Sequence, residues 1–172
     1  MPPSTPLRLL AALVVAIGCS SSTPPSVSNS RHSVLFIGNS LTYTNDLPGT
    51  VATIAASAGD TIDAASVAYG NFALIDHLNG GQSLPTIAKG GWEFVVLQQG
   101  PSTVPVNADS LKLWTQMFAP HIRAVGATPA LLMVWPDSTR EAFFDDCRAS
   151  YLAAAQSVGG MFIPAGYAWQ IA

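Results

Sequence analysis

Short apolar runs alternate with helix-like segments along this sequence of 172 residues. Five of the runs have the length and composition of buried strands: 34–37, 62–68, 94–97, 130–135 and 161–164. The first, third and fourth runs are almost continuously apolar, as expected of strands in a parallel sheet whose two faces are both covered. Because crossover helices join parallel strands, the alternation predicts an α/β fold. We expect a three-layer α/β/α sandwich around a five-stranded parallel sheet.

Residues that begin and end helices lie between these runs. Pro48 suits a first helical turn, and Gly59 is expected to end that helix. Asn107 is expected to cap a helix that ends at Gly126. Residues 138–141, Ser-Thr-Arg-Glu, match the capping-box pattern for a further helix. After the last apolar run, the chain is expected to open one more helix.

The composition limits the classes of protein to which the chain can belong. Hydrophobic residues make up 49% and charged residues 10%, which is too apolar for a disordered chain. The length suffices for one domain with a sizeable core. The formal net charge of -3 provides no basic surface, so we expect no nucleic acid partner.

The N-terminus has the composition of an export signal. An apolar stretch from Leu7 to Ile17 ends in small residues before Cys19, which resembles a bacterial lipoprotein box. We expect residues 1–19 to be a signal peptide with Cys19 lipidated, 20–32 a flexible Ser/Pro-rich tether, and 33–172 the folded domain. The protein is then an exported lipoprotein on the cell envelope, and only the lipid touches the membrane. The alternatives are plain secretion and an ordinary signal in which Cys19 is incidental.

The first apolar run leads directly into Gly38-Asn39-Ser40-Leu41-Thr42, and helix-start residues follow at Asp46 and Pro48. This order is typical of a buried strand, a sharp turn and a helix. Open α/β folds place their sites at the carboxyl ends of the strands. Backbone N–H groups near a helix start favour negative charge on a reacting oxygen. Ser40 is therefore our candidate nucleophile for acyl transfer.

Two further loops should meet this turn, because each follows a strand of the same sheet. Tyr69-Gly70-Asn71 follows the second apolar run, and Gln98-Gln99-Gly100 follows the third. These loops offer flexible backbone N–H groups and side-chain amides. With the hydroxyl of Ser40, they would supply a nucleophile and an oxyanion hole.

The segments VLFIGNSLTYTNDLP, WEFVVLQQGPS and LLMVWP, in this order, resemble the SGNH (GDSL-like) hydrolase superfamily. The likeness is to a bacterial branch with Gly-Asn-Ser-Leu/Phe-Thr in place of Gly-Asp-Ser-Leu, and it covers residues 33–170. It implies a flavodoxin-like domain and a serine esterase that forms an acyl-enzyme and needs no metal or cofactor. The implied substrate is a small-molecule or carbohydrate ester, with O-acetyl groups on carbohydrate as one possibility.

The resemblance also implies a role for each matching residue. Ser40 would be the nucleophile, and its backbone N–H one oxyanion donor. Gly70 N–H would be the second donor, with Asn71 as an alternative register. The third donor would be a glutamine amide, with Gln98 favoured and Gln99 a close second. Asn39 would brace the turn rather than react.

One part of the family pattern is absent from this sequence. The superfamily's catalytic base is a histidine in an Asp-x-x-His block before the final helix, and none of His32, His77 and His121 occupies that place. A serine without a base is a weak nucleophile at neutral pH. We therefore expect that the chain is truncated before this block, and that as written it hydrolyses little or no ester.

Two other classes of function compete with this interpretation. A non-catalytic, surface-anchored binding module would keep the fold and the pocket without a base. A flavodoxin-like binder of a phosphorylated ligand is disfavoured, because the first turn lacks the Ser/Thr/Gly content and the positive charge for phosphate. No cysteine/histidine spacing indicates zinc, and no glycine-rich motif indicates a nucleotide.

Overall fold

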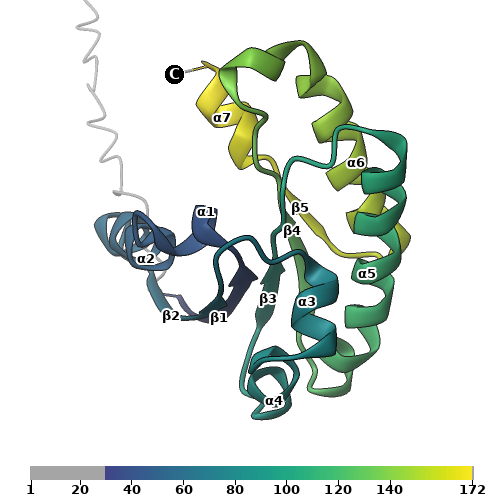
Figure 1. Ribbon diagram of the computed structural model, residues 1–172. Coiled ribbons are helices and arrows are strands. Elements are labelled where there is room, and N and C mark those ends of the chain that lie inside the picture. Colours follow the sequence, from purple (N-terminus) through teal and green to yellow (C-terminus); the bar gives the residue numbers. More distant parts are fainter. Residues whose placement is uncertain (1–29, 172) are drawn as a thin grey trace, which may run out of the picture.

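The structure of the protein is a computed structural model, and it describes residues 30–171. Its centre is a parallel sheet with the strand order β2-β1-β3-β4-β5 (Figure 1). The strands are β1 (Arg31–Gly38), β2 (Thr61–Ala68), β3 (Phe94–Leu97), β4 (Thr128–Leu132) and β5 (Met161–Ile163). This order is that of flavodoxin-like sheets, so the predicted fold class is confirmed.

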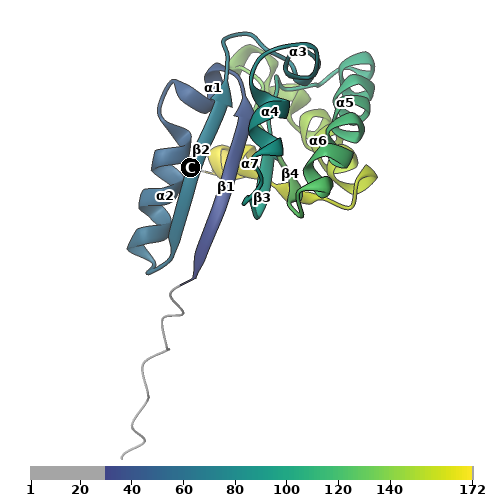
Figure 2. The same cartoon turned by 90° about the horizontal axis from the view of Figure 1, so that it is seen from below.

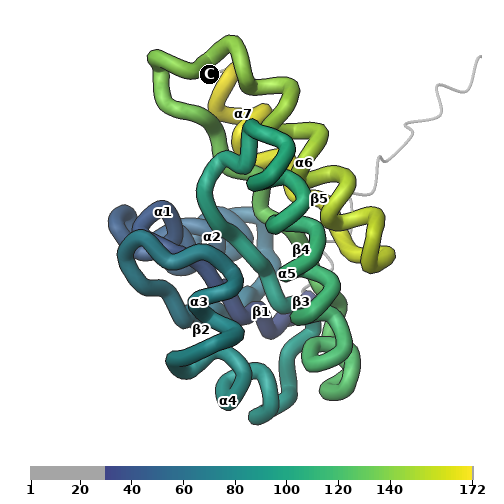
Figure 3. The backbone as a smooth tube through the Cα atoms, turned by 45° about the vertical axis from the view of Figure 1, so that its right-hand side comes forward, coloured from purple at the N-terminus to yellow at the C-terminus, as the bar shows by residue number. Residues whose placement is uncertain are grey.

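Helices connect the strands and cover the sheet on both faces. In the described part of the chain they are α1 (Ser40–Tyr43), α2 (Leu47–Ser57), α3 (Leu74–Asn79), α4 (Ser83–Ala88), α5 (Pro105–Ala124), the 3-10 helix η1 (Ser138–Phe143), α6 (Phe144–Ser157) and α7 (Ala165–Ile171). The long helices α5 and α6 pack against each other (Figure 3). The segment after β5 forms α7, as expected.

The two faces of the sheet bury different residues of each strand, because successive side chains of a strand point to opposite sides. Leu35 and Ile37 of β1 are fully buried in the larger hydrophobic cluster, which includes side chains of α3, α4, α5 and α6. Val34 and Phe36 lie in the smaller cluster, against which residues of α2 and α7 pack. A groove of about 190 Å³, lined by apolar side chains, remains on this second face.

The strand bounds differ from the expected ones by more than one residue in β1 and β4. β1 begins at Arg31 rather than Val34, and Arg31 pairs with Asp63 of β2 at 2.6 Å. Arg31 and His32 of the expected tether are therefore part of the sheet. β4 ends at Leu132, and the rest of its apolar run continues without ladder pairing, although Met133 N–H still donates to Ile163 O at 2.9 Å.

Two predicted helix caps are wrong. α5 begins at Pro105 with Val104 as its N-cap, so Asn107 lies inside the first turn. Proline is favoured at this position because it has no N–H to leave unpaired. At the next helix, Asp137 is the cap: its carboxylate accepts from Thr139 N–H at 3.0 Å, and a 3-10 turn follows. The predicted capping box at Ser138 therefore does not form.

The expected site lies at the carboxyl end of the sheet. Figure 2 shows that α1 and α3 begin at the same end of β1 and β2. The expected signal peptide, including Cys19, lies outside the described residues. Among residues 30–171, no helix combines the length and the apolar character needed to cross a membrane.

Candidate active site

The turn after β1 is held by hydrogen bonds from almost all of its backbone N–H groups. Asn39 N–H donates to Gln98 Oε1 at 2.9 Å. Leu41 N–H donates to the Asn39 side chain at 3.1 Å, and Thr42 N–H donates to Asn39 O at 2.9 Å. Asn39 thus acts as the N-cap of α1. Ser40 N–H is left without a hydrogen bond to any described residue.

Gln98 fixes the same turn from β3, and it is 1% exposed. Its Oε1 also accepts from the Thr42 hydroxyl at 2.8 Å. Its Nε2 donates to Asn39 Oδ1 at 3.0 Å and to Gln99 O at 2.7 Å. Gly38 lets this amide come close, because a Cβ there would lie 2.4 Å from Gln98 Oε1 and 2.3 Å from Thr42 Oγ1.

His77 of α3 supports the turn through a hydrogen bond to Gly38 and is buried, with 1% of its surface exposed. Its Nε2 lies 2.9 Å from Gly38 O, which can only accept, so this nitrogen carries the hydrogen. Nδ1 then accepts from the Ser83 hydroxyl at 2.7 Å. Burial lowers the pKa of His77 below its ordinary value, and the Gly38 hydrogen bond offsets part of this shift. The side chain is therefore a neutral brace.

Ser40 differs from its neighbours because its side chain is not used to build the turn. The residue is half-buried. None of the side-chain hydrogen bonds that hold residues 38–42 within the described structure uses the Ser40 hydroxyl. The Ser40 hydroxyl and the Ser40 N–H are therefore both free to meet a ligand.

The loop after β2 presents two more free backbone donors. Asn71 has a φ of 64°, and Gly70 and Asn71 are both exposed. Tyr69 N–H and Phe72 N–H are bonded within the backbone, whereas the N–H groups of Gly70 and Asn71 meet no acceptor among the described residues. The loop is tied to the first turn because Asn39 Nδ2 donates to Phe72 O at 3.1 Å.

The Tyr43 side chain lies beside this second loop, although Tyr43 is not among the site residues predicted from the sequence. A Cβ on Gly70 would come within 3.2 Å of the Tyr43 hydroxyl. Tyr43 is one turn after Ser40 on α1, a spacing that places two side chains on one face of a helix. That spacing is the sequence signal that could have found it.

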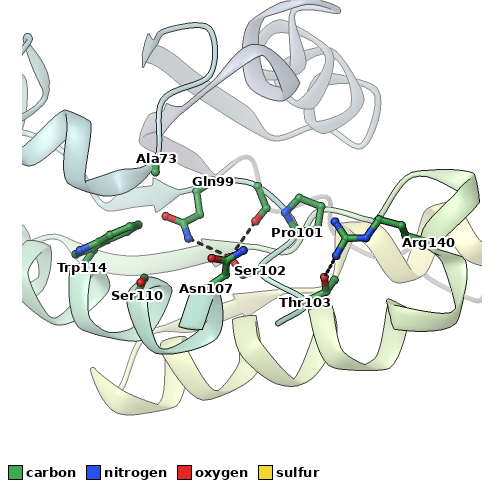
Figure 4. Close-up of a pocket in the computed structure, with 10 residues that line it drawn as sticks. Ala73, Gln99, Pro101, Ser102, Thr103, Asn107, Ser110, Trp114 and Arg140 are labelled. Carbon is green, nitrogen blue, oxygen red and sulfur yellow. Dashed lines mark hydrogen bonds between the residues drawn. The ribbon is translucent and has the colours of Figure 1, made fainter. Parts of the chain in front are cut away.

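The two glutamines of the third loop have different partners. Both N–H groups of Gln98 Nε2 are engaged within the protein, so in this structure neither is free for a substrate oxygen. Gln99 Oε1 accepts from Leu74 N–H at 3.2 Å, and its Nε2 donates to Ser102 Oγ at 3.0 Å. One Gln99 N–H therefore remains, and Gln99 lines a cavity of about 230 Å³ (Figure 4).

Tyr151 of α6 holds this third loop from the helical layer and is fully buried. Its hydroxyl accepts from Gln99 N–H at 3.2 Å and lies 2.7 Å from Gln99 O, to which it donates. Burial raises the pKa of this hydroxyl. The helical spacing of Tyr151 indicates only a core position, so the sequence carried no signal for its polar contact.

No described histidine is hydrogen-bonded to Ser40. His77 is used by Gly38 and Ser83. His32, near the amino end of β1, lies 2.7 Å from Glu93 and 3.1 Å from Ser30. His121 is exposed in the last turn of α5. Within residues 30–171, no three His, Cys, Asp or Glu side chains are grouped to hold a metal ion.

The comparisons with known proteins bear on the fold. No protein-family model matches the sequence, and no curated protein matches it. Among solved structures, a proposed SGNH hydrolase from Slackia heliotrinireducens matches with a TM-score of 0.65 and 21% identity, over 77% of this chain and 78% of that chain.

Two enzymes with lower identity match over similar lengths. A lipase/acylhydrolase from Enterococcus faecalis has a TM-score of 0.60 and 13% identity, over 82% of this chain and 80% of that chain. A variant of an acetyl xylan esterase from Geobacillus stearothermophilus has a TM-score of 0.53 and 13% identity, over 84% and 83%. The chain therefore has the fold of the SGNH hydrolases, as its sequence resemblance predicts.

Proposed function

We propose that this chain carries the nucleophile and the oxyanion hole of a serine ester hydrolase. The observation that supports this most is the hydrogen bonding of the turn after β1. Every other backbone N–H of residues 39–42 is satisfied, while Ser40 keeps both its N–H and its hydroxyl free. A braced turn with one free hydroxyl suits a preorganised nucleophile, because no protein contact must break before reaction.

In the proposed reaction, Ser40 Oγ attacks the ester carbonyl carbon while a base takes its proton. The negative charge that develops on the carbonyl oxygen is stabilised by Ser40 N–H and by Gly70 N–H, with Asn71 N–H as the alternative. The alcohol leaves with a proton from the conjugate acid of the base, and an acyl group remains on Ser40. Water then attacks this acyl-enzyme and restores the serine.

A glutamine amide is the proposed third donor. The Gln98 amide would first have to exchange one of its two internal hydrogen bonds. Gln99 has a spare N–H, but its amide is directed to Leu74 and Ser102 rather than to the turn. We therefore assign Gln98 mainly to bracing the turn, and we keep Gln99 as the amide available to a substrate in the neighbouring cavity.

The base is proposed to be none of the three histidines of this sequence, because His32 and His77 are held by other partners and His121 is exposed in the last turn of α5. Residues 1–172 alone are then expected to hydrolyse little or no ester. The same histidine contacts favour the second candidate function, a non-catalytic binding module. The next codons of the gene separate the two functions: an Asp-x-x-His block supports the enzyme.

The test is hydrolysis of p-nitrophenyl acetate by the full-length product of the gene. Ser40→Ala is expected to abolish turnover, because no other free hydroxyl occupies the turn. Ser57→Ala is the matched control, since Ser57 is an exposed serine on α2 whose hydroxyl donates only to Ile54 O. Unchanged turnover in Ser40→Ala would remove Ser40 from the mechanism.

The acyl group is proposed to be small, with carbohydrate O-acetyl esters as the leading class. The acetyl xylan esterase among the structural neighbours supports this choice by analogy of fold alone. The test compares p-nitrophenyl acetate with p-nitrophenyl octanoate and with acetylated xylan. Faster turnover of the octanoate would contradict the proposal.

We also propose that the protein is a lipoprotein of the cell envelope. The apolar stretch before Cys19 and the Ser/Pro-rich segment after it support this proposal. Cys19→Ala is expected to leave the protein without lipid and to release it from the membrane fraction. A wild-type protein that already fractionates as soluble would contradict the anchor.

A further inference from the structure

The cavity beside the candidate active site has a polar floor between an aromatic end and a cationic end. Figure 4 shows Trp114 of α5 at one end and Arg140 of η1 at the other, with Gln99, Ser102 and Asn107 between them. Its volume of about 230 Å³ lies below the roughly 300 Å³ at which pockets for drug-sized ligands begin. The cavity therefore suits a single ring-sized group.

Arg140 brings a positive charge to this cavity without a carboxylate partner. Its Nη2 donates to Thr103 Oγ1 at 2.6 Å, and its Cζ lies 5.6 Å from the centre of the Phe143 ring. The ion pairs among the described residues are Arg31–Asp63 and His32–Glu93, and neither includes Arg140. Asp137 lies near enough for its charge to interact with that of Arg140, but its carboxylate accepts a hydrogen bond from Thr139 N–H and forms no ion pair with Arg140.

The rest of the guanidinium is left for a ligand. A guanidinium has five N–H donors in a planar fork that matches a carboxylate in a two-point contact. Thr103 uses one of these donors. The contacts with Thr103 and Phe143 hold the side chain in place, which reduces the conformational entropy that binding would otherwise cost.

The floor of the cavity is held in a conformation that most residues avoid. Ser102 has a φ of 55° and is buried. Its hydroxyl donates to Gly100 O at 3.1 Å and accepts from Gln99 Nε2, while Ser102 O accepts from the Ser150 hydroxyl at 2.8 Å. Strained backbone persists where its surroundings fix it, and it often marks a binding site.

The cavity combines one aromatic surface with several polar groups, a combination that suits a sugar ring. The half-buried Trp114 offers an indole surface for the apolar face of the ring. The spare N–H of Gln99, the amide of Asn107 and the hydroxyl of Ser110 can bind ring hydroxyl groups. A purely apolar acyl chain would leave the spare N–H of the buried Gln99 without a partner.

We propose that this cavity binds a sugar ring that carries a carboxylate, with the carboxylate on Arg140 and the ring against Trp114. Its place in catalysis, as the subsite for the alcohol part of the ester, rests on the proposed function. Two loops link it to the turn. Ala73 of its lining follows Phe72, whose carbonyl accepts from Asn39, and Gln99 follows Gln98, which binds Asn39. The substrate class is then an O-acylated acidic saccharide.

The test measures binding of two methyl glycosides that differ only in the group at C6: methyl α-D-galacturonide and methyl α-D-galactoside. The chain is labelled with ¹⁵N, and each sugar is titrated while the indole N–H signals of the four tryptophans are followed. Trp114→Phe identifies the signal of Trp114. We expect this signal to shift, and we expect the galacturonide to bind roughly tenfold more tightly, as a charge-assisted hydrogen bond allows.

Arg140→Gln is expected to remove the preference for the galacturonide and to leave galactoside binding unchanged. Arg148→Gln is the matched control, because Arg148 lies 5.4 Å over the Tyr167 ring in the same way but does not line the cavity. Equal affinity for the two sugars, a shift of other tryptophans only, or the same loss in both arginine variants would overturn the proposal.

Failure of this inference is distinguishable from failure of the proposed function. Ser40→Ala is expected to retain galacturonide binding, because Ser40 does not line the cavity. An esterase that depends on Ser40 but shows no preference for acidic sugars would overturn the subsite alone. Galacturonide binding in a protein whose esterase activity survives Ser40→Ala would overturn the proposed function and keep the cavity as a sugar site.

Discussion

Gln98→Ala tests whether the turn that carries Ser40 depends on one buried amide. The substitution leaves the Asn39 N–H and the Thr42 hydroxyl without their acceptor. Asn39 and Thr42 are 8% and 1% exposed, so water has little access to either group. A buried donor without a partner costs about 1–3 kcal/mol. The two donors together predict a loss of about 2–6 kcal/mol in the free energy of unfolding.

The assay is equilibrium unfolding in urea, followed by circular dichroism. With a urea dependence of about 1–3 kcal/mol per molar, the transition midpoint should fall by at least about 0.7 M. Gln98→Met separates the two causes of instability, because methionine keeps most of the volume but makes none of the hydrogen bonds. We expect Gln98→Met to lose nearly as much stability as Gln98→Ala.

The matched control is Gln116→Ala, at an exposed position on α5, where a change within about 0.5 kcal/mol is expected. Two results would refute the reasoning. One is a loss of less than about 1 kcal/mol in Gln98→Ala, since less than one unsatisfied donor would then be at stake. The other is full stability in Gln98→Met, which would show that packing alone holds the turn.

Two further predictions concern buried titratable groups. Burial lowers the pKa of His77 in the folded state, so below about pH 6.5 the unfolded chain binds more protons than the folded one. The free energy of unfolding should therefore decrease as the pH falls below this value, by at most about 1.4 kcal/mol per pH unit. Urea unfolding between pH 7.5 and pH 5 should show this loss in the control variant His121→Gln and a smaller loss in His77→Gln. Equal dependence of the unfolding free energy on pH in the two variants would contradict the prediction. Burial also raises the pKa of Cys147 to about 12, and its thiol donates to Val134 O at 3.2 Å. In a Cys19→Ala background, the Cys147 thiol should therefore react with Ellman's reagent at pH 8 only after the protein is unfolded in urea. Stoichiometric reaction of the folded protein within seconds would argue against this burial.

The order of the elements could be predicted from the sequence because it depends on local patterns. The apolar run before Gly38 identified β1, and Pro48 with Gly59 marked α2. The turn at Ser40 was also visible locally, since a strand, a glycine and a helix start follow one another within a few residues. These signals need no knowledge of distant parts of the chain.

The polar contacts of the site could not be predicted in this way, because they join residues far apart in sequence. His77 reaches Gly38 across 39 positions, and Arg140 reaches Thr103 across 37. Arg140 was part of a local capping pattern in the sequence, whereas in the structure it lines a cavity formed by another loop. Which polar side chains meet is decided by how the helices pack on the sheet.

β1 lies between two strands of the sheet, and its place separates the part of this protein that must stay fixed from the part that can vary. β1 pairs with β2 on one side and with β3 on the other, so the loops that follow these strands flank Ser40 whatever their sequences. Of the third loop, Gln98 is the residue that binds the turn directly, whereas Asn107 and Ser110 of α5 line the cavity without contacting the turn. Directed evolution can therefore vary positions such as Asn107 and Ser110 to seek new selectivity while the serine keeps its place.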